Sequence, residues 1–473
     1  MASNDYRDNL IPFNSPRLVE ARGLDPHEFA KAIKATPRAI GLIDLWQSLY
    51  DEPFKGITSN GVVEKGLFHL ADEGLDSGSV ARAGQALLAV LSDGEREKIC
   101  YPIDAPEWRA WYNPEWPLNS HGLRLEYASP RAREAVLNLM RASLGYEGYV
   151  KTNRCRSANL FLGELYDLRN ILNEWSYHFL LFGKPSPTGP WGWSLYGHHL
   201  AVNCFLLGGQ IVVSPAFWGA EPCIVDRGPH DSFRLFEKEE SGGLELMRSL
   251  SPEMQQRATI YRQMKDPAMP EGRWHFADER QLGGAFRDNR VIPCEGVAAA
   301  EFSSRQQEQL LQVFDAFLEC LPPQPRAARL RRIASVLDRT YFSWIGGHGE
   351  EDPFYYRAQS PVLMVEFDHH SGVWLTNAEP AKYHVHTIVR TPNGNDYGKD
   401  LLRQHYEIFH QKGSPHLNQA REPAARSQAE VHQRDSTHEQ NHDHEHDHGH
   451  GHHHSHELGD PHSGEAGDGL AAE

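Results

Sequence analysis

The sequence lacks long hydrophobic runs, an excess of basic residues and an obvious export signal. No stretch reaches the roughly 18 apolar residues of a transmembrane helix, and the first segment, MASNDYRDNLIPFNSPR, contains no apolar core of a signal peptide. Lys and Arg number 47 against 64 Asp and Glu, so the formal net charge is −17 and no basic stripe marks a nucleic-acid-binding surface. We therefore expect a cytoplasmic protein that binds neither nucleic acid nor an anionic membrane.

Cysteine is scarce as well, with six residues and no Cys-x-x-Cys pair. In a chain of 473 residues this pattern predicts reduced, mostly buried thiols, which suit a reducing compartment. Hydrophobic residues make up 40% of the chain, so most of it can fold around a sizeable core.

Helix-like and strand-like segments follow one another in blocks along the chain. Apolar spacing predicts helices over residues 79–92, 130–144, 158–173, 243–263, 303–321 and 397–411. Aromatic and β-branched runs predict strands within 176–222 and again from about residue 340, with a hairpin turn at Gly208 and Gly209. This order predicts an α+β fold, in which a helical N-terminal part packs on an antiparallel or mixed sheet.

The chain divides into three parts by composition. Residues 1–54 are weakly patterned and are interpreted as an N-terminal extension. Residues 55–415 carry the helical and strand patterns and are predicted to form a single α+β body. Residues 416–473 are polar, rich in acids and histidine, and without apolar periodicity, which predicts a disordered tail.

Histidine is concentrated in the tail, where residues 442–456 read HDHEHDHGHGHHHSH. Neutral imidazole is the commonest protein ligand for zinc, nickel and copper, and the interleaved acids add oxygen ligands. Expression tags, in contrast, are usually uninterrupted histidine runs. We therefore predict that divalent transition metals bind the tail histidines: His442, His444, His446, His448, His450, His452, His453, His454 and His456.

A His-x-His motif within residues 383–390, YHVHTIVR, is the sharpest signal in the body. Alternate residues of a strand share one face, so His384, His386 and Arg390 are expected to point the same way. Two histidines on one strand can supply two metal ligands from a rigid element. The alternative is a pair of hydrogen-bonded surface histidines.

Two further segments offer a third ligand. PVLMVEFDHH, residues 361–370, places Glu366 at the end of an apolar strand, where a carboxylate needs a partner because burying it bare is costly. Glu366 is a candidate ligand or general base, or an acid that simply reaches water. GWSLYGHHL, residues 192–200, contains His198 and His199, which are expected to diverge if they lie on a strand, with a slight preference for His198.

Two arginines are candidates for binding an anionic substrate. Arg357 follows the aromatic run FYYR, and Arg390 ends the His-x-His strand. A guanidinium group suits carboxylates because it donates two parallel hydrogen bonds. Ordinary ion pairing is the alternative role for each.

Long segments of the chain resemble one known family. GKPSPTGPWGWSLYGHHLAVNCFLLGGQIVVSPAFWGAEP resembles the signature of the domain-of-unknown-function 3500 family, and SWIGG, FYYR, PVLMVEFD and HVHTIVRTPNGNDYGKDLLRQHYE are similar to its C-terminal half. The resemblance spans about residues 55–410 and leaves the tail outside. The family implies no reaction, and many relatives resemble exported proteins. It places these residues in recurrent motifs: His198, His199, Glu366, His384, His386, Arg390 and Asp396.

These patterns favour a metal-dependent enzyme that acts on a small anionic substrate. The expected cofactor is a divalent transition metal, with zinc first and iron or nickel as alternatives, held by His384, His386 and one of Glu366, His198 or His199. Hydrolysis at zinc is the first expectation, and an oxygenase with two histidines and one carboxylate on iron is the second. A metal chaperone or store, which the tail favours, and a metal-free binding module are the alternatives.

Overall fold

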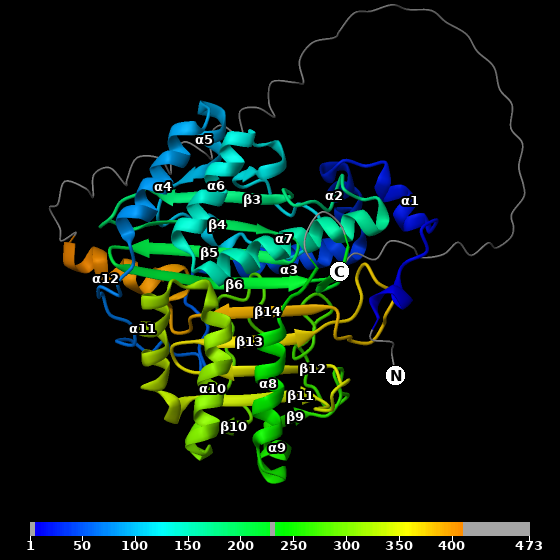
Figure 1. Ribbon diagram of the computed structural model, residues 1–473, viewed down its shortest axis with the longest axis vertical. Helices are drawn as coiled ribbons and strands as arrows, with labels where there is room; N and C mark the ends of the chain where they lie inside the picture. The colour runs from blue at the N-terminus through cyan, green and yellow to red at the C-terminus, as the bar shows by residue number, and fades with distance from the viewer. Residues whose placement is uncertain (1–4, 228–231, 410–473) are drawn as a thin grey trace, which may run out of the picture. The chain divides into compact units, whose positions relative to one another are not determined.

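The computed structural model of the chain describes residues 5–227 and 232–409 (Figure 1). The predicted tail, with the nine histidines of residues 442–456, lies outside these residues. The described part is built from helices and one large mixed sheet, as the order of the sequence patterns predicts.

Three α-helices lie within residues 1–54, the weakly patterned N-terminal extension. Each begins with a proline at its first position after a residue that favours helix N-termini: Ser15, Asp25 or Thr36. The side chains of Asp25 and Thr36 accept hydrogen bonds from backbone N–H groups of the first turn. The helices are α1 (Pro16–Arg22), α2 (Pro26–Lys34) and α3 (Pro37–Asp51).

The remaining helices match most of the predicted segments. Two of them differ from the prediction. The predicted 158–173 helix starts earlier and ends at Asp167, which has a left-handed backbone, and the predicted 243–263 helix is divided before Pro252. The helices are α4 (Ser77–Val90), α5 (Asp93–Ile99), α6 (Pro130–Ser143), α7 (Tyr146–Tyr166), α8 (Glu237–Ser249), α9 (Pro252–Ala258), α10 (Ser304–Phe317), α11 (Pro323–Ala334) and α12 (Lys399–Phe409).

Twelve strands form the large sheet, and its main path runs β1-β3-β4-β5-β6-β14-β13-β12-β11-β10. Only β1 with β3 and β9 with β11 pair in parallel. A separate pair is formed by β7 (Ile224–Val225) and β8 (Phe233–Arg234). The sheet strands are β1 (Cys100–Tyr101), β2 (Leu123–Arg124), β3 (Tyr177–Gly183), β4 (Trp191–Gly197), β5 (Leu200–Leu207), β6 (Gln210–Ala220), β9 (Thr259–Tyr261), β10 (Val297–Ala298), β11 (Tyr341–Gly346), β12 (Phe354–Gln359), β13 (Met364–His369) and β14 (Val385–Arg390).

The sheet consists of two antiparallel meanders, β3 to β6 and β11 to β14, which meet where β14 pairs with β6. Helices α4, α6, α7, α8 and α10 lie on the face turned to the viewer in Figure 1. On that face Trp218 donates to Thr152 of α7, and Tyr356 donates to the backbone of Glu239 in α8. The other face is covered by the segment around residues 279–288, which contacts β13 and β14.

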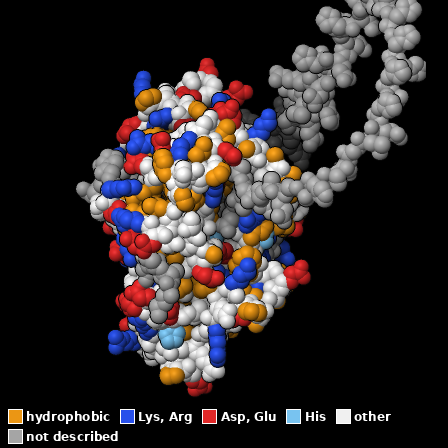
Figure 2. All heavy atoms as spheres, turned by 90° about the vertical axis from the view of Figure 1, so that its right-hand side faces the viewer, with side chains coloured by type: hydrophobic (Ala, Val, Ile, Leu, Met, Phe, Trp, Pro, Cys, Tyr) orange, Lys and Arg blue, Asp and Glu red, His pale blue; other side chains and the backbone are white. Residues whose placement is uncertain are grey.

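The surface carries charges of both signs. Figure 2 shows Lys and Arg interspersed with Asp and Glu over the face it presents, without a basic field. Within the described residues, no helix has both the length and the apolar character needed to cross a membrane. All six cysteines are free thiols, and four of them are buried.

Candidate metal centre

The junction between the two meanders brings the histidine motifs together. In β14, His386 lies opposite Gly219 of β6 on one side and opposite Asp368 of β13 on the other. Trp218, which precedes Gly219 in β6, pairs with Leu200 at the start of β5. The β4–β5 turn, which contains His198 and His199, therefore ends beside the His-x-His strand.

His198 and His199 form the two central residues of a hairpin turn, and they do not lie on a strand. His199 has a left-handed backbone (φ 56°), a conformation that histidine adopts more readily than most residues. The two rings consequently stack at 4.0 Å between centroids and do not diverge. The backbone N–H of His199 is held by the side-chain oxygen of Asn113 at 3.1 Å.

Three imidazoles converge behind this turn: those of His199, His384 and His386. The Nε2 atom of His384 lies 3.2 Å from Nε2 of His199 and 3.0 Å from Nε2 of His386. All three side chains are buried. Two nitrogens bound to one tetrahedral zinc at about 2.0–2.1 Å lie about 3.3 Å apart, so these separations fit a shared ion.

Hydrogen bonding fixes the tautomer of His384. Its Nδ1 atom lies 2.6 Å from the carbonyl oxygen of Ser371, which can only accept a hydrogen bond. Nδ1 therefore carries the proton, and the lone pair of Nε2 faces the other two imidazoles. The carboxylate of Glu221, held by the N–H groups of Val373, Trp374 and Leu375, lies 3.7 Å behind the same Nδ1 atom. Such outer partners orient metal-binding histidines in proteins.

Burial keeps the three imidazoles neutral. Desolvation lowers the pKa of His384 to about 4. Desolvation and neighbouring histidines hold the pKa values of His199 and His386 well below the ordinary value. Neutral imidazole is the form that binds metals. We therefore interpret this histidine trio, His199, His384 and His386, as a group that can hold a divalent ion.

A small cavity of about 30 Å³ adjoins the trio and is lined by His199 and His386. A cavity needs roughly 10–15 Å³ to hold a water molecule, so this one, the histidine cavity, can hold one. Glu115 also lines it, is buried, and has a carboxylate oxygen without a hydrogen-bond partner among the described residues. Desolvation raises the pKa of Glu115 to about 7, which suits a group that both accepts and donates a proton near neutrality.

One family model, described as "Protein of unknown function (DUF3500)", matches residues 73–399. The chain belongs to this family. No curated protein and no solved structure matches the chain. The histidine trio and Glu115 lie inside the family region, whereas α1 to α3 and the tail lie outside it.

A second buried group in this family member lies next to the trio and consists of Glu279, Asp368 and His370. Arg280 donates to both oxygens of Asp368, at 2.7 and 3.2 Å, and also pairs with Glu279. Burial opposes the ionisation of Glu279, but Arg280 and His370 outweigh it and lower its pKa to about 2. At Asp368 burial outweighs Arg280 and raises the pKa to about 7, so the single guanidinium group compensates Glu279 more fully than Asp368.

His370 connects the two groups. Its ring centroid lies 4.3 Å from that of His386, and its Nδ1 atom lies 3.5 Å from the carboxylate of Glu279. Its Nε2 atom has no hydrogen-bond partner among the described residues, and its side chain lines the histidine cavity. Alternation along the strand, which places Glu366 and Asp368 on one face, is the sequence signal that also places His370 there.

Glu366 does not join the trio, contrary to the expected convergence. Its carboxylate accepts hydrogen bonds from the N–H groups of Leu282 and Gly283 at 2.9 and 2.8 Å, and from Tyr355 at 2.5 Å. These donors come from a segment distant in sequence and satisfy the buried acid. His198 is not a member of the trio, because its Nδ1 atom is 2.8 Å from the side-chain oxygen of Asn159, although its side chain also lines the histidine cavity.

The two arginines chosen from the sequence are buried in ion pairs. Arg357 pairs with Glu295 at 2.7 Å, and Arg390 pairs with Asp288 at 2.7 Å and with Asp396 at 2.9 Å. Arg357 is 1% exposed and Arg390 is not exposed at all, so neither guanidinium is presented to a substrate. Their ordinary role, ion pairing, is the one the structure favours.

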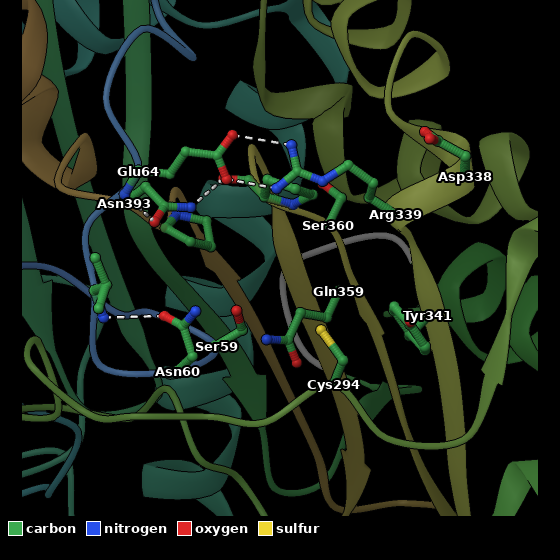
Figure 3. A pocket seen from close by; sticks show the side chains of 13 residues that line it. Ser59, Asn60, Glu64, Cys294, Asp338, Arg339, Tyr341, Gln359, Ser360 and Asn393 are labelled. Carbon is green, nitrogen blue, oxygen red and sulfur yellow. Dashed lines mark hydrogen bonds and ion pairs between the residues drawn. The ribbon is translucent and has the colours of Figure 1, made fainter.

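A larger pocket of about 460 Å³ lies beyond the C-terminal end of β14 (Figure 3). Its arginine, Arg339, pairs with Glu64 at 2.9 Å, and Gln359 lies beside Cys294. None of the residues that line it is a histidine. This pocket therefore does not fit a metal centre, and the histidine cavity is the stronger functional candidate.

Proposed function

We propose that the protein is a zinc-dependent hydrolase in which the histidine trio holds one ion and Glu115 acts as general base and acid on a small anionic substrate. The convergence of the three Nε2 atoms beside a water-sized cavity carries this proposal. Three protein ligands next to open space are typical of catalytic zinc sites, whereas structural sites have four. The free thiols suit a reducing compartment, and we place the enzyme in the cytoplasm.

The donor set favours zinc over the iron alternative. An oxygenase of the second expected kind needs two histidines and one carboxylate on the metal, and here Glu366 is held by other donors. Three imidazoles without a carboxylate suit zinc. A zinc ion held by them supplies Lewis acidity and lowers the pKa of water at its open position.

Glu115 carries the proton in this proposal. It accepts a proton from water as the water oxygen bonds to the acyl carbon of an ester or amide. It then gives this proton to the leaving oxygen or nitrogen as the bond to the acyl carbon breaks. The products are a carboxylic acid and an alcohol or amine, so one water is consumed and no oxidant is needed. In the protein without metal, burial raises the pKa of Glu115 to about 7, and a dication at the trio would lower it from there, which favours the base form at neutral pH.

The test uses the full-length chain with the nine histidines of residues 442–456 changed to asparagine, called the tail-silenced protein. We expect about one zinc per chain after dialysis against a weak chelator, because three buried imidazoles form one site. The double variant His384→Ala/His386→Ala is expected to hold none. Metal content is measured by mass spectrometry and folding by circular dichroism.

Glu115→Gln separates catalysis from metal binding. It should keep its zinc but hydrolyse the mono-4-nitrophenyl ester of glutaric acid, which carries one carboxylate, roughly 10²–10⁴-fold more slowly, the usual contribution of a general base. Glu134→Gln, at an exposed position of α6, serves as the matched control and should retain full activity. A folded, tail-silenced protein without zinc would overturn the metal centre and favour a metal-free module. Zinc without hydrolysis would favour a metal-handling protein.

A further inference from the structure

A second pocket lies one layer of side chains away from the histidine cavity. This outer pocket, of about 640 Å³, is lined by apolar side chains that include Leu45, Leu49, Trp274 and Phe286. Its volume is in the range of small-molecule sites. It is more than large enough for the body of a substrate that the histidine cavity, at about 30 Å³, cannot contain.

Two contacts form the wall between the spaces. Trp46 lines the histidine cavity and stacks on Phe286 of the outer pocket, with ring centroids 5.4 Å apart. Asp278 lines the histidine cavity and pairs with Arg287 of the outer pocket at 3.2 Å. An aromatic pair and an ion pair thus connect the linings of the two spaces.

Phe286 is held in an unfavourable backbone conformation. Its φ of 62° lies in the left-handed region, which a bulky residue seldom adopts. Strain of this kind concentrates at binding and catalytic sites, where the surrounding structure fixes it. Trp46, its stacking partner, has an indole N–H without a hydrogen-bond partner among the described residues. Both observations point to a wall shaped for a ligand.

Arg290 gives the outer pocket a cation that is available to a ligand. Its Nη2 atom donates to the carbonyl oxygen of Gly272, and among the described residues no carboxylate lies within ion-pairing distance. Arg290 is partly buried, whereas Glu52 and Glu271 of the same pocket are exposed. Arg290 is therefore unlike Arg357 and Arg390, whose guanidinium groups are already paired.

We infer that the outer pocket binds the body of the substrate, a molecule with an aromatic or branched apolar group and a carboxylate that pairs with Arg290. That this ligand is a substrate rests on the proposed function, in which the bond to be hydrolysed reaches the trio past Trp46 and Phe286. The apolar lining supplies affinity through burial, and the guanidinium group selects the anion through charge-assisted hydrogen bonds.

The probes are 4-phenylbutyrate, its neutral analogue 4-phenylbutanamide, and butyrate, each titrated calorimetrically into the tail-silenced protein. We expect 4-phenylbutyrate to bind at least about tenfold more tightly than either, since a hydrogen bond to a charged group contributes more than a neutral one. Arg290→Gln should remove the advantage over the amide, and Arg290→Lys should keep part of it. Arg305→Gln, at an exposed position of α10, is the matched control and should bind as the unchanged protein does.

The double variant His384→Ala/His386→Ala distinguishes the two proposals. Unchanged phenylbutyrate binding in this variant, with loss in Arg290→Gln, supports the pocket whatever the metal content. If this pattern appears and the tail-silenced protein with an intact trio holds no zinc, the hydrolase proposal fails and the outer pocket is a carboxylate-binding site alone. Equal binding of acid and amide, or binding that depends on the histidines and not on Arg290, would overturn the inference.

Discussion

The histidine trio and the neighbouring Glu279–Asp368–His370 group differ in what faces their buried polar atoms. In the trio, Nε2 atoms face one another at 3.0 and 3.2 Å. In the second group, both carboxylates face Arg280, which already supplies positive charge and hydrogen bonds. Three converging imidazoles offer ligand atoms to a cation, and an Nε2–H of a neighbouring ring can also satisfy them, whereas the carboxylates of the second group are already engaged by a guanidinium group. The comparison teaches that proximity of ligand atoms alone does not identify a metal site.

Breaking the Arg280–Asp368 pair should produce the largest effect on stability. Asp368→Asn leaves a buried guanidinium with reduced compensation, and removing one partner of a buried pair costs about 3–5 kcal/mol. Both side chains are essentially unexposed. The measurement is the urea unfolding midpoint of the tail-silenced protein in chelator. Asp315→Asn, which breaks the partly exposed pair with Arg326, is the control and should cost less than about 1 kcal/mol.

The same variant tests the comparison directly. Folded Asp368→Asn should retain about one zinc per chain, because Asp368 balances Arg280 and does not hold the ion. If the folded variant loses its zinc, the carboxylate group belongs to the metal centre and the distinction between the two groups is wrong.

Glu115 should make stability fall as pH rises. Its pKa is raised by burial from 4.5 to about 7, with Arg17 opposing the shift and Glu221 adding to it. The folded state therefore keeps a proton between these values that the unfolded state has lost. The stabilising contribution is complete below about pH 4.5 and is lost as pH rises through about 7.

Glu115→Gln removes this dependence. Because one pKa unit corresponds to about 1.4 kcal/mol, the variant should gain up to about 3 kcal/mol over the unchanged protein between pH 5 and pH 8 in chelator. Urea midpoints at both pH values give the difference, which cancels the shared contributions of Glu221 and the buried histidines. A constant difference between the two proteins would show that the carboxylate is already ionised at pH 5.

Local periodicity predicted much of the fold and part of the site. Alternation along β14 placed His384 and His386 on one face, and the hairpin at Gly208 and Gly209 formed between β5 and β6 as expected. The first three helices were missed, although Ser15, Asp25 and Thr36 each precede a proline, a signal typical of helix starts.

The remaining site residues depend on contacts that no local pattern contains. Glu366 and Asp368 have the same strand spacing, yet backbone N–H groups from Leu282 and Gly283 satisfy one and Arg280 satisfies the other. Glu115 lies in an irregular segment and reaches the histidine cavity only through the tertiary fold. Sequence alone could not choose among these acids, because their partners lie far away along the chain.

Of the substitutions Asp368→Asn, Glu115→Gln and Gly219→Ala, we expect Gly219→Ala to have the smallest effect, because it replaces no ligand of the trio. A Cβ atom there would lie 2.9 Å from Cδ2 of His386, 3.1 Å from the carbonyl oxygen of Val385 and 3.3 Å from Cδ2 of His199, so the His386 ring must shift and the His199 ring is crowded. Changes that reorient metal ligands usually cost about 10–100-fold in affinity. We therefore expect Gly219→Ala to bind zinc about 10–100-fold more weakly, measured by chelator competition in the tail-silenced protein.

Gly242→Ala, whose Cβ would meet only Val313 at an ordinary 3.7 Å, is the matched control and should bind zinc normally. Because none of the three atoms nearest to the Cβ of Gly219→Ala belongs to the second group, the Arg280–Asp368 pair stays intact, and the unfolding midpoint of this variant in chelator should shift less than that of Asp368→Asn. Unchanged zinc affinity in Gly219→Ala would mean that the His199 and His386 rings do not hold the ion.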